Sequence, residues 1–422
     1  MNNMFVKLKD IADLTVGYVG NMTKEYIETG VPFFRSLNIK PFYIDKSDLL
    51  YISSEFNEKI KKSKLMTGDL VIVRTGQPGT CCVVPQEFDG CNCSDLVIVR
   101  PDKKLVNPYY LEAYINFMAQ KQINNHQVGA IQKHFNVGSA KEMLVYLPDR
   151  EKQEKIANIV RRINSKIELN NKINTELESM AKTLYDYWFL QFEFPNKEGK
   201  PYKSSGGKMV WNEELKREIP EGWEVQTVKK CIHHINTGLN PRDNFKLGNG
   251  HIKYITVKNL TVNGTIDFSD CDQIDEEARK IVHKRSDVSR GDILFASIAP
   301  LGRCVIVQEN PRDWDINESV FCIRPNLNKV STELLYMFFM SDYFVKKAEH
   351  SSTGSVFNGI RISTLEEMLI LIPTKSIKDK FTDTVKNIFA KKYQNEKENQ
   401  EIISIRDFLL PLLMNGQVGF EC

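Results

Sequence analysis

The sequence predicts an α+β fold, in which two duplicated mixed α/β globular domains are separated by two long helices that form an antiparallel coiled coil. Two observations predict it. The stretch from Gly129 to Pro148 returns as Gly354 to Pro373, with residue numbers that differ by 373 − 148 = 225, so one fold occurs twice. Each copy is followed by a long segment that contains no glycine and no proline, as expected of a long helix.

The globular domains are predicted at residues 1–148 and 223–373. Both contain short β-branched runs bounded by Gly, Pro or Asp, such as "DLVIVR" and "CCVVP" in the first and "ILFASI" and "SVFCIRP" in the second. Helical patterns follow the last strand of each copy. The shift drifts along the chain, since Asn38 and Asn259 have numbers that differ by 259 − 38 = 221. Such a drift is expected when loops differ in length between two copies of one fold.

The long helices are predicted within 149–190 and 374–422. Over residues 156–188, apolar side chains step by four and three, which is the spacing of a coiled-coil seam. Adding 225 to each position gives a second seam, in which Lys392 and Arg406 are the departures. Their aliphatic stems are expected to carry the charges outward to solvent. Two ordinary surface helices packed on separate cores are the alternative.

Two asparagines interrupt each predicted seam. Asn170 and Asn174 in the first helix recur as Asn395 and Asn399 in the second, because 395 − 170 = 225. In the antiparallel register that brings the asparagines together, Asn170 faces Asn399 and Asn174 faces Asn395. Trp188 then lies level with Phe381. One polar layer of this kind fixes the register at some cost in stability.

Composition and charge narrow the class of protein. The 57 basic and 54 acidic residues leave a net charge of +3, so any basic surface for nucleic acid must be local. The first residues, "MNNMFVKLKD", lack the apolar core of a signal peptide, and the longest apolar run is "LLYMFFM" from Leu334. A cytoplasmic protein is therefore expected. The nine cysteines lack zinc spacing and are expected to be buried thiols.

No motif predicts catalysis or a metal site. The stretch "GGKM" from Gly206 lacks the Ser or Thr and the spacing of a phosphate-binding loop. The tetrad "NPYY" from Asn107 resembles that of amino-methyltransferases, but its third position is Tyr109 rather than Pro, so a helix start is the preferred interpretation. His233 and His234 are adjacent and lack carboxylates at metal spacing, which favours a turn or an exposed pair.

The long helices and the segment between them resemble a known family. Each helix begins just after a proline, Pro148 or Pro373, and ends in "LYDYWF" or "FLLPLLMNGQV". The stretch "FEFPNKEGKPYKSSGGKMVWNEELKREIPEGW" leads from the first helix to the second globular domain. In these features the chain is similar to the specificity subunit of type I restriction-modification enzymes.

The resemblance implies a non-catalytic DNA-recognition subunit of an adenine methyltransferase and endonuclease complex. Residues 1–148 and 223–373 would be target recognition domains, each of which reads one half of a bipartite double-stranded DNA target. The helices in 149–190 and 374–422 would space them and dock two methyltransferase subunits, and through these the restriction subunits. Residues 191–222 would form an extended, mostly irregular connector. S-adenosylmethionine and ATP are expected on the partner subunits, and no cofactor in this chain.

The predicted seam is long enough for a spacer of this kind. From residue 156 to residue 188 is 32 steps, which span about 48 Å in a helix, or roughly 14 base pairs. A rod of that length could hold two recognition domains about one turn of DNA apart. Changing its length is expected to change the unread gap between the half-sites.

Candidate DNA contacts lie in loops that both copies share. Lys61 and Lys62 align with Lys284 and Arg285 and suit phosphate binding, with a solvated basic helix face as the alternative. Side chains that differ between the copies are candidates for reading bases, since Arg can pair with guanine and Gln with adenine. These are Arg74 and Gln77 against Arg303, and Gln132, Lys133 and His134 against Ser355, Asn358 and Arg361.

The aromatic end of the first helix offers Tyr187 and Phe189 as docking residues for a methyltransferase subunit. Two other classes of function are open. A stand-alone DNA-binding scaffold or regulator would have the same duplication and no methyltransferase partner. A self-sufficient restriction enzyme is disfavoured, because the motifs that it needs are missing.

Overall fold

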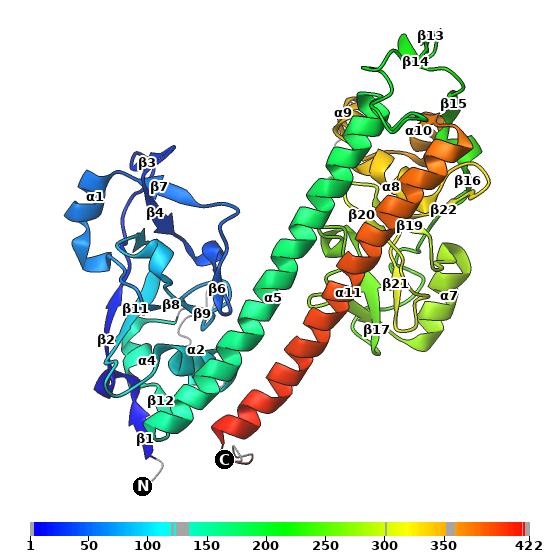
Figure 1. Ribbon diagram of the computed structural model, residues 1–422. Helices are drawn as coiled ribbons and strands as arrows, with labels where there is room; N and C mark the ends of the chain where they lie inside the picture. Colours follow the sequence, from blue (N-terminus) through cyan, green and yellow to red (C-terminus); the bar gives the residue numbers. More distant parts are fainter. Residues whose placement is uncertain are drawn as a thin grey trace. The chain divides into compact units, whose positions relative to one another are not determined.

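The chain folds into two compact units in the computed structural model. One is formed by Met1–Asn170 with Lys397–Cys422, and the other by Asn171–Glu396. Each unit contains one copy of the repeat and one part of each long helix (Figure 1). The structure describes residues 4–119, 122–123, 135–299, 302–351, 359–415 and 417.

The first unit is built on two four-stranded sheets. Their strands are β2 (Ala12–Val16), β3 (Tyr26–Ile27), β4 (Val31–Phe34), β7 (Leu50–Ile52), β8 (Leu70–Val73), β9 (Cys81–Val83), β10 (Asn92–Cys93) and β11 (Leu96–Pro101). One sheet has the antiparallel order β2-β11-β8-β9. The other has the order β10-β4-β7-β3, with β10 parallel to β4. The β-branched runs of the sequence form the central strands, and every residue of β8 is buried.

Short elements complete the first unit. They are β1 (Met4–Lys7), which pairs with β12 (Leu144–Leu147), the hairpin of β5 (Ile39–Lys40) and β6 (Tyr43–Ile44), and the helices α1 (Ser54–Lys59), α2 (Pro108–Phe117) and α4 (Val137–Glu142). Asn107 caps α2, because its side chain accepts hydrogen bonds from the backbone of Tyr109 and Tyr110. The "NPYY" tetrad is therefore a helix start, as predicted.

The second unit repeats these sheets. Its strands are β15 (Glu224–Thr227), β16 (Ile232–Thr237), β17 (Ile252–Ile255), β18 (Asp272–Ile274), β19 (Ile293–Ala296), β20 (Cys304–Ile306), β21 (Trp314–Ile316), β22 (Val320–Pro325) and β23 (Leu369–Ile372). The order β16-β22-β19-β20 repeats β2-β11-β8-β9, the parallel pair β17 and β21 repeats β4 and β10, and β15 with β23 repeats β1 with β12. The predicted duplication is confirmed.

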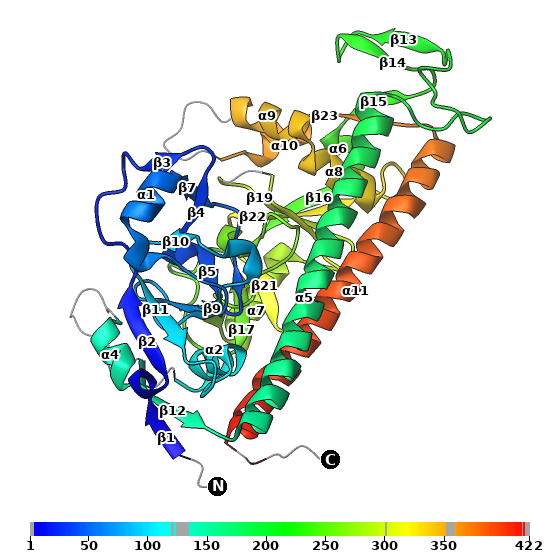
Figure 2. The ribbon, with the colours of Figure 1, turned by 60° about the vertical axis from the view of Figure 1, so that its left-hand side comes forward.

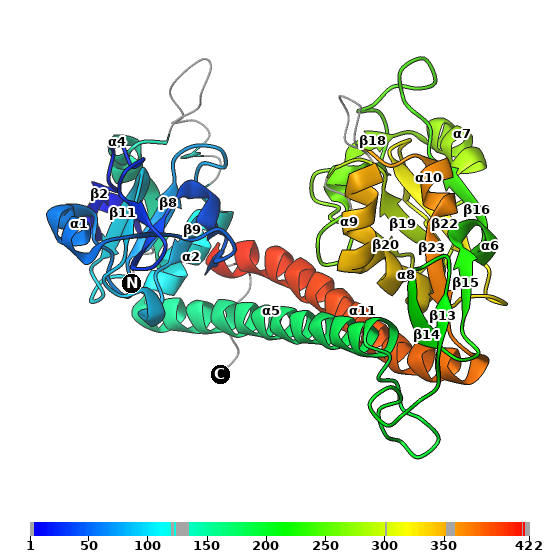
Figure 3. The same cartoon turned by 90° about the horizontal axis from the view of Figure 1, so that it is seen from above.

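The helices of the second unit are α6 (Val228–Cys231), α7 (Glu276–Ser286), α8 (Thr332–Met340), α9 (Asp342–Ser351) and α10 (Ile362–Glu367). α8 lies against the sheet of β16, β22, β19 and β20 (Figure 3). The contact is aromatic, since Phe339 of α8 packs edge-on against Phe295 of β19 at 5.5 Å between ring centroids. This side of the sheet carries one core of the second unit, and the other side carries a second.

One loop is repeated down to its hydrogen bonds. Asn38 Oδ1 accepts from the backbone N–H three residues earlier, and its amide donates to two carbonyls seven and ten residues later, both at 3.2 Å. Asn259 makes the same three bonds, to carbonyls eight and eleven residues later at 3.1 Å. The second loop is thus one residue longer, which accounts for part of the drift in the repeat.

The long helices are α5 (Arg150–Tyr185), extended by a π-helical turn at Asp186–Leu190, and α11 (Lys375–Met414). The first unit contains the start of α5 and the end of α11, which share one core. The second unit contains the end of α5 and the start of α11, where Trp188 packs on Phe381 at 5.7 Å. The helices are therefore antiparallel, as predicted.

The connector, residues 191–222, is mostly irregular, as predicted, apart from one short element. It contains an antiparallel hairpin of β13 (Met209–Asn212) and β14 (Arg217–Pro220) (Figure 2). Phe192 and Phe194 of the connector are buried, and both pack against Trp223, with ring centroids 5.7 and 5.0 Å away. The hairpin was not predicted, because its two strands have only four residues each and show weak periodicity.

The eight cysteines in the described part of the chain are free thiols, and all but Cys271 are buried, as predicted. Burial raises the pKa of the Cys81 and Cys304 thiols well above its ordinary value, so these thiols stay protonated. Within the described residues, no helix has both the length and the apolar character needed to cross a membrane.

Candidate DNA interface and helical spacer

Two asparagine pairs join the long helices. In the first unit, Asn170 Nδ2 donates to Asn399 Oδ1 at 2.8 Å and to Glu398 Oε2 at 2.9 Å. In the second unit, Asn395 Nδ2 donates to Asn174 Oδ1 at 2.8 Å. All four asparagines are buried. These are the pairs of the antiparallel register derived from the sequence, and in each unit the two helices contact each other directly.

Replacing Asn174 by leucine is expected to lower the free energy of unfolding of the second unit by about 1–2 kcal/mol, because the buried amide of Asn395 loses this partner. Replacing both residues of the pair by leucine is expected to recover that loss, since no polar group is then left unpaired. Urea unfolding followed by tryptophan fluorescence measures the effect, because all four tryptophans lie within Asn171–Glu396. Simple additivity of the two single substitutions would contradict the pairing.

Lys392 and Arg406 do not extend to solvent, so the interpretation of outward-reaching stems is wrong. Lys392 is 7% exposed, and its Nζ lies 2.8 Å from Glu178 Oε1 of α5. The side chain of Arg406 is 13% exposed, and its Nη1 donates to Asn164 Oδ1 of α5 at 3.0 Å. Both charges remain inside because each finds polar partners within its own unit.

The predicted phosphate contacts lie at equivalent places in the two copies. Lys61 and Lys62 are exposed on the short helical turn that follows α1. Lys284 and Arg285 are exposed on the last turn of α7. In each copy, two adjacent cations thus lie at or just after the end of a helix. This helix is α1, which precedes β8, in the first copy and α7, which precedes β19, in the second. That arrangement suits contact with a phosphate backbone.

His283, which precedes Lys284 and Arg285 on α7, was not predicted as a site residue. His283 Nδ1 of α7 lies 2.9 Å from Asp315 Oδ2, and Ser286 Oγ donates to Asp315 Oδ1 at 2.6 Å. Burial raises the pKa of Asp315. The first copy has Asn92 at this place, whose Oδ1 accepts from the following N–H as that of Asp315 does. The alignment alone could not show that the acid meets a histidine.

The candidate base-reading residues differ in their surroundings. Arg74 forms an ion pair with Asp95 and donates to the carbonyl of Phe135 at 3.4 Å, so its guanidinium is already engaged. Gln77 is exposed on the same loop. Arg303 is partly buried and donates to the carbonyl of Leu260 at 3.1 Å.

Arg361 is exposed directly before α10. Gln132, Lys133, His134, Ser355 and Asn358 lie outside the described residues. Of the described candidates, Gln77 and Arg361 are therefore the ones with side chains available to a ligand.

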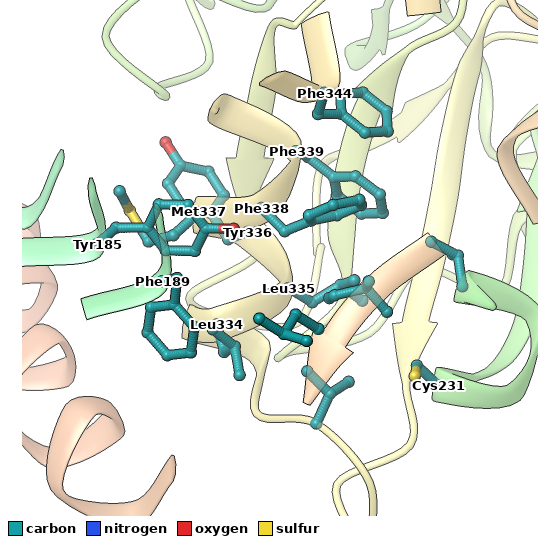
Figure 4. Close-up of a cluster of buried hydrophobic side chains, with 14 of the residues drawn as sticks. Tyr185, Phe189, Cys231, Leu334, Leu335, Tyr336, Met337, Phe338, Phe339 and Phe344 are labelled. Atoms are coloured by element: carbon teal, nitrogen blue, oxygen red, sulfur yellow. The ribbon is translucent and has the colours of Figure 1, made fainter. Parts of the chain in front are cut away.

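The two candidate docking residues have opposite surroundings. Tyr187 is 38% exposed, whereas Phe189 is 2% exposed. Phe189 stacks on Tyr185 and meets Phe381 and Trp223 at centroid distances of 4.8 and 5.4 Å. Figure 4 shows it facing α8 inside the core of the second unit. The prediction that Phe189 docks a partner is wrong, because the rings of Tyr185, Trp223 and Phe381 enclose it.

The described residues contain no group of three or more His, Cys, Asp or Glu side chains that could hold a metal ion. His233 is exposed and His234 partly buried, both on β16. Burial, followed by the charge of Arg324, lowers the pKa of His234 and favours its neutral form. The two histidines therefore lie on a strand rather than in a turn, and only His233 is exposed.

The same globular domain occurs once in each unit, beside the antiparallel helices. The two copies present cations at equivalent places and carry different side chains in their loops. These features define a two-part recognition protein. A family model described as the type I restriction modification DNA specificity domain matches residues 2–179 and 220–404. The chain belongs to this family of DNA specificity proteins.

Its relatives match over nearly the whole chain. The MjaIX specificity subunit of a type I restriction enzyme from Methanocaldococcus jannaschii is 25% identical, over 98% of this chain and 93% of that protein. The HindI specificity subunit from Haemophilus influenzae is 23% identical, over 90% and 92%. The crystal structure of a type I restriction-modification S subunit from M. genitalium has the same fold, with a TM-score of 0.53 at 14% identity over 98% of this chain and 96% of that one.

Proposed function

We propose that this specificity subunit reads a bipartite DNA target, with one half-site bound by residues 1–148 and the other by residues 223–373. The observation that carries the proposal is the repetition of one scaffold with different loop side chains. The asparagine-capped loop keeps the same hydrogen bonds in both copies, whereas Gln77 and Arg303 occupy a matching loop with different chemistry. A shared frame with different polar side chains is what two readers of unlike sequences require.

The helices dock the partner subunits in this proposal. Met180 of α5 and Ile405 of α11 are 57% and 54% exposed, and they are equivalent because 405 − 180 = 225. Leu169 and Ile173, 53% and 36% exposed, lie on the same face of α5 as Met180, since they precede it by eleven and seven residues. Exposed apolar side chains at equivalent positions suit one methyltransferase subunit each.

The partners supply the chemistry in this proposal. Two methyltransferase subunits bind S-adenosylmethionine and methylate adenine, and restriction subunits that join through them use ATP. The chain itself contributes DNA recognition and spacing. A stand-alone scaffold or regulator differs in one respect, since it would not bind a methyltransferase subunit.

Co-expression with the methyltransferase subunit of its own operon tests the proposal. We expect a stable complex that methylates adenine within one two-part motif on genomic DNA. Exchanging residues 1–148 for those of a related subunit is expected to change one half of the motif and leave the other half intact. A complex that methylates without sequence preference, or a chain that binds no methyltransferase subunit, would reject the proposal.

The basic pairs allow a test on DNA binding. Replacing both Lys284 and Arg285 by glutamine is expected to weaken binding to all sequences and to reduce the slope of log K against log salt by about 2, because two phosphate contacts are lost. The double replacement of Lys61 and Lys62 is expected to do the same. The comparison is made with the assembled complex, by fluorescence anisotropy at several salt concentrations. An unchanged slope would place both pairs on ordinary solvated surfaces.

A further inference from the structure

The two cations that interrupt the second seam, Lys392 and Arg406, touch the same structural element in the two copies. In the first copy this element is the β5–β6 hairpin. In the second copy it is residues 260–266, closed by a bridge between Leu260 and Ile266. Both hairpins begin directly after the repeated asparagine of the capped loop, so they are equivalent.

In the second unit, Lys392 fastens the hairpin to both helices. Its ammonium donates to the backbone carbonyl of Asn263 at the hairpin tip. The same ammonium lies 2.8 Å from Glu178 of α5 and 3.5 Å from Glu396 of α11. Gly264 follows at the tip with φ +65°, and a Cβ there would clash with the hydroxyl of Tyr336. The tip is thus closely fitted against α8 and the helix pair.

In the first unit, Arg406 makes the corresponding contact through rings. Its guanidinium carbon lies 5.1 Å from the ring centroid of Phe42 at the hairpin tip, and 5.4 Å from that of Phe117 on α2. Its Nη1 also donates to Asn164 on α5. Phe42 has φ +73°, a strained conformation for a residue with a side chain. With this backbone conformation, the ring of Phe42 lies against the guanidinium of Arg406.

Coiled-coil packing alone does not require the charged side chains of Lys392 and Arg406 at these positions. At the equivalent seam positions of α5, Ile167 and Ala181 are apolar, because 392 − 225 = 167 and 406 − 225 = 181. Withdrawing a cation from water is costly unless its partners are well placed, and an apolar residue is often at least as stable. A buried charge of this kind therefore serves to select one arrangement rather than to add stability.

Each contact lies far from the point where the domain joins its helix. Lys392 lies 392 − 375 = 17 residues after the first residue of α11. Asn164, the partner of Arg406, lies 164 − 150 = 14 residues after the first residue of α5. At the rise of an α-helix these are arms of about 26 and 21 Å. A pivot of about 10° at the junction would displace the far end of a 20 Å arm by roughly 3.5 Å, which is one base-pair rise.

We propose that Lys392 and Arg406 are positioning residues: they fix the orientation of each recognition domain on the helix pair within its unit and thereby restrict the target to one gap length between the half-sites. The inference rests on the proposed function. In this proposal the length of the helices sets the mean gap between the half-sites. The contacts of Lys392 and Arg406 with the hairpins set how far the gap can vary from that mean.

The test uses the complex with its methyltransferase subunits. Once the wild-type motif has been mapped on genomic DNA, three duplexes are compared, with the two half-sites at the native gap and at one base pair less and more. Lys392→Met is expected to raise the ratio of methylation rates at the altered gaps to that at the native gap about fivefold, as expected for the loss of one buried contact. The half-site sequences are expected to stay the same. Lys391→Met is the matched control, because Lys391 is the exposed neighbour on the same helix.

A second variant tests the other copy without removing a charge. Phe42→Gly removes the ring that Arg406 contacts, and glycine adopts the positive φ without strain. The ring also packs on Phe117, so circular dichroism is used to confirm that the variant folds. The same loss of gap selectivity is expected. Gap selectivity equal to wild type in both variants would overturn the inference, as would loss of methylation at every gap in complexes that assemble normally. Absence of any two-part motif with the wild-type chain would instead defeat the proposed function.

Discussion

Replacing Arg324 by leucine is expected to lower the free energy of unfolding of the second unit by about 3 kcal/mol, because it leaves a buried carboxylate without its counter-ion. Asp292 is 1% exposed, and both of its oxygens accept from Arg324 at 2.8 Å. Hydrogen bonding to Asp292 raises the pKa of Arg324. A second ion pair, to Asp287 at 2.8 Å, holds the guanidinium in place.

The first copy provides the matched control. Arg100 and Asp69 are the equivalent pair, but Arg100 Nε lies 3.6 Å from Asp69 Oδ2, and the arginine side chain is 37% exposed. Burial raises the pKa of Asp69 in spite of this partner. Arg100→Leu is therefore expected to cost only about 1 kcal/mol. The same two residues thus have unequal effects in two copies of one fold.

Tryptophan fluorescence separates the two outcomes. All four tryptophans lie in the second unit, so their signal in a urea titration follows that unit. Arg324→Leu is expected to lower the fluorescence midpoint by about 1 M urea. Arg100→Leu is expected to leave it nearly unchanged and to alter only the transition seen by far-UV circular dichroism. Equal shifts in fluorescence for the two variants would refute the assignment.

The parts of the structure that could be predicted are those that recur in the sequence. The duplication and the pairing of Asn170 with Asn399 follow from periodic positions, since a coiled coil places its polar exceptions opposite each other. The pair Asp292 and Arg324 also recurs, as Asp69 and Arg100, and it could have been recognised as structural from the repeat alone.

The parts that could not be predicted depend on partners distant in the chain. Lys392 stays buried because the carbonyl of Asn263, 129 residues earlier, meets its ammonium. Phe189 belongs to a core because the connector returns Trp223 onto it. Neither partner has a periodic relation to the helix on which these residues lie. The availability of the candidate base-reading residues could not be predicted for the same reason. Arg74, for example, forms an ion pair with Asp95, which is a tertiary contact.

The copies also differ at one buried position on the helices α2 and α8. Glu112 on α2 is 3% exposed and accepts a hydrogen bond from the backbone N–H of Val83 on β9 at 2.8 Å. At the equivalent place on α8 stands Tyr336, because 336 − 112 = 224. Burial raises the pKa of Glu112 from 4.5 to about 8. The carboxyl is therefore mostly protonated at neutral pH in the folded protein.

Glu112→Gln is accordingly expected to stabilise the first unit by about 3 kcal/mol at neutral pH and to flatten its dependence on pH. Unfolded Glu112 ionises near pH 4.5, whereas the folded protein keeps the proton until about pH 8. Unfolding between these values releases a proton, so the stability that is fully present below pH 4.5 falls as the pH rises and levels off above about 8. Glutamine is neutral in both states and preserves the acceptor for Val83, so this loss does not occur.

Urea titrations followed by circular dichroism from pH 5 to pH 9 measure the slope, with fluorescence used to subtract the second unit. Wild type is expected to lose up to about 1.4 kcal/mol per pH unit from this group below pH 8. Glu28→Gln, which changes an exposed glutamate of the same unit, is the control and should keep the wild-type slope. If Glu112→Gln keeps that slope as well, the carboxyl ionises inside the fold, and the packing of α2 on β9 must admit water to it.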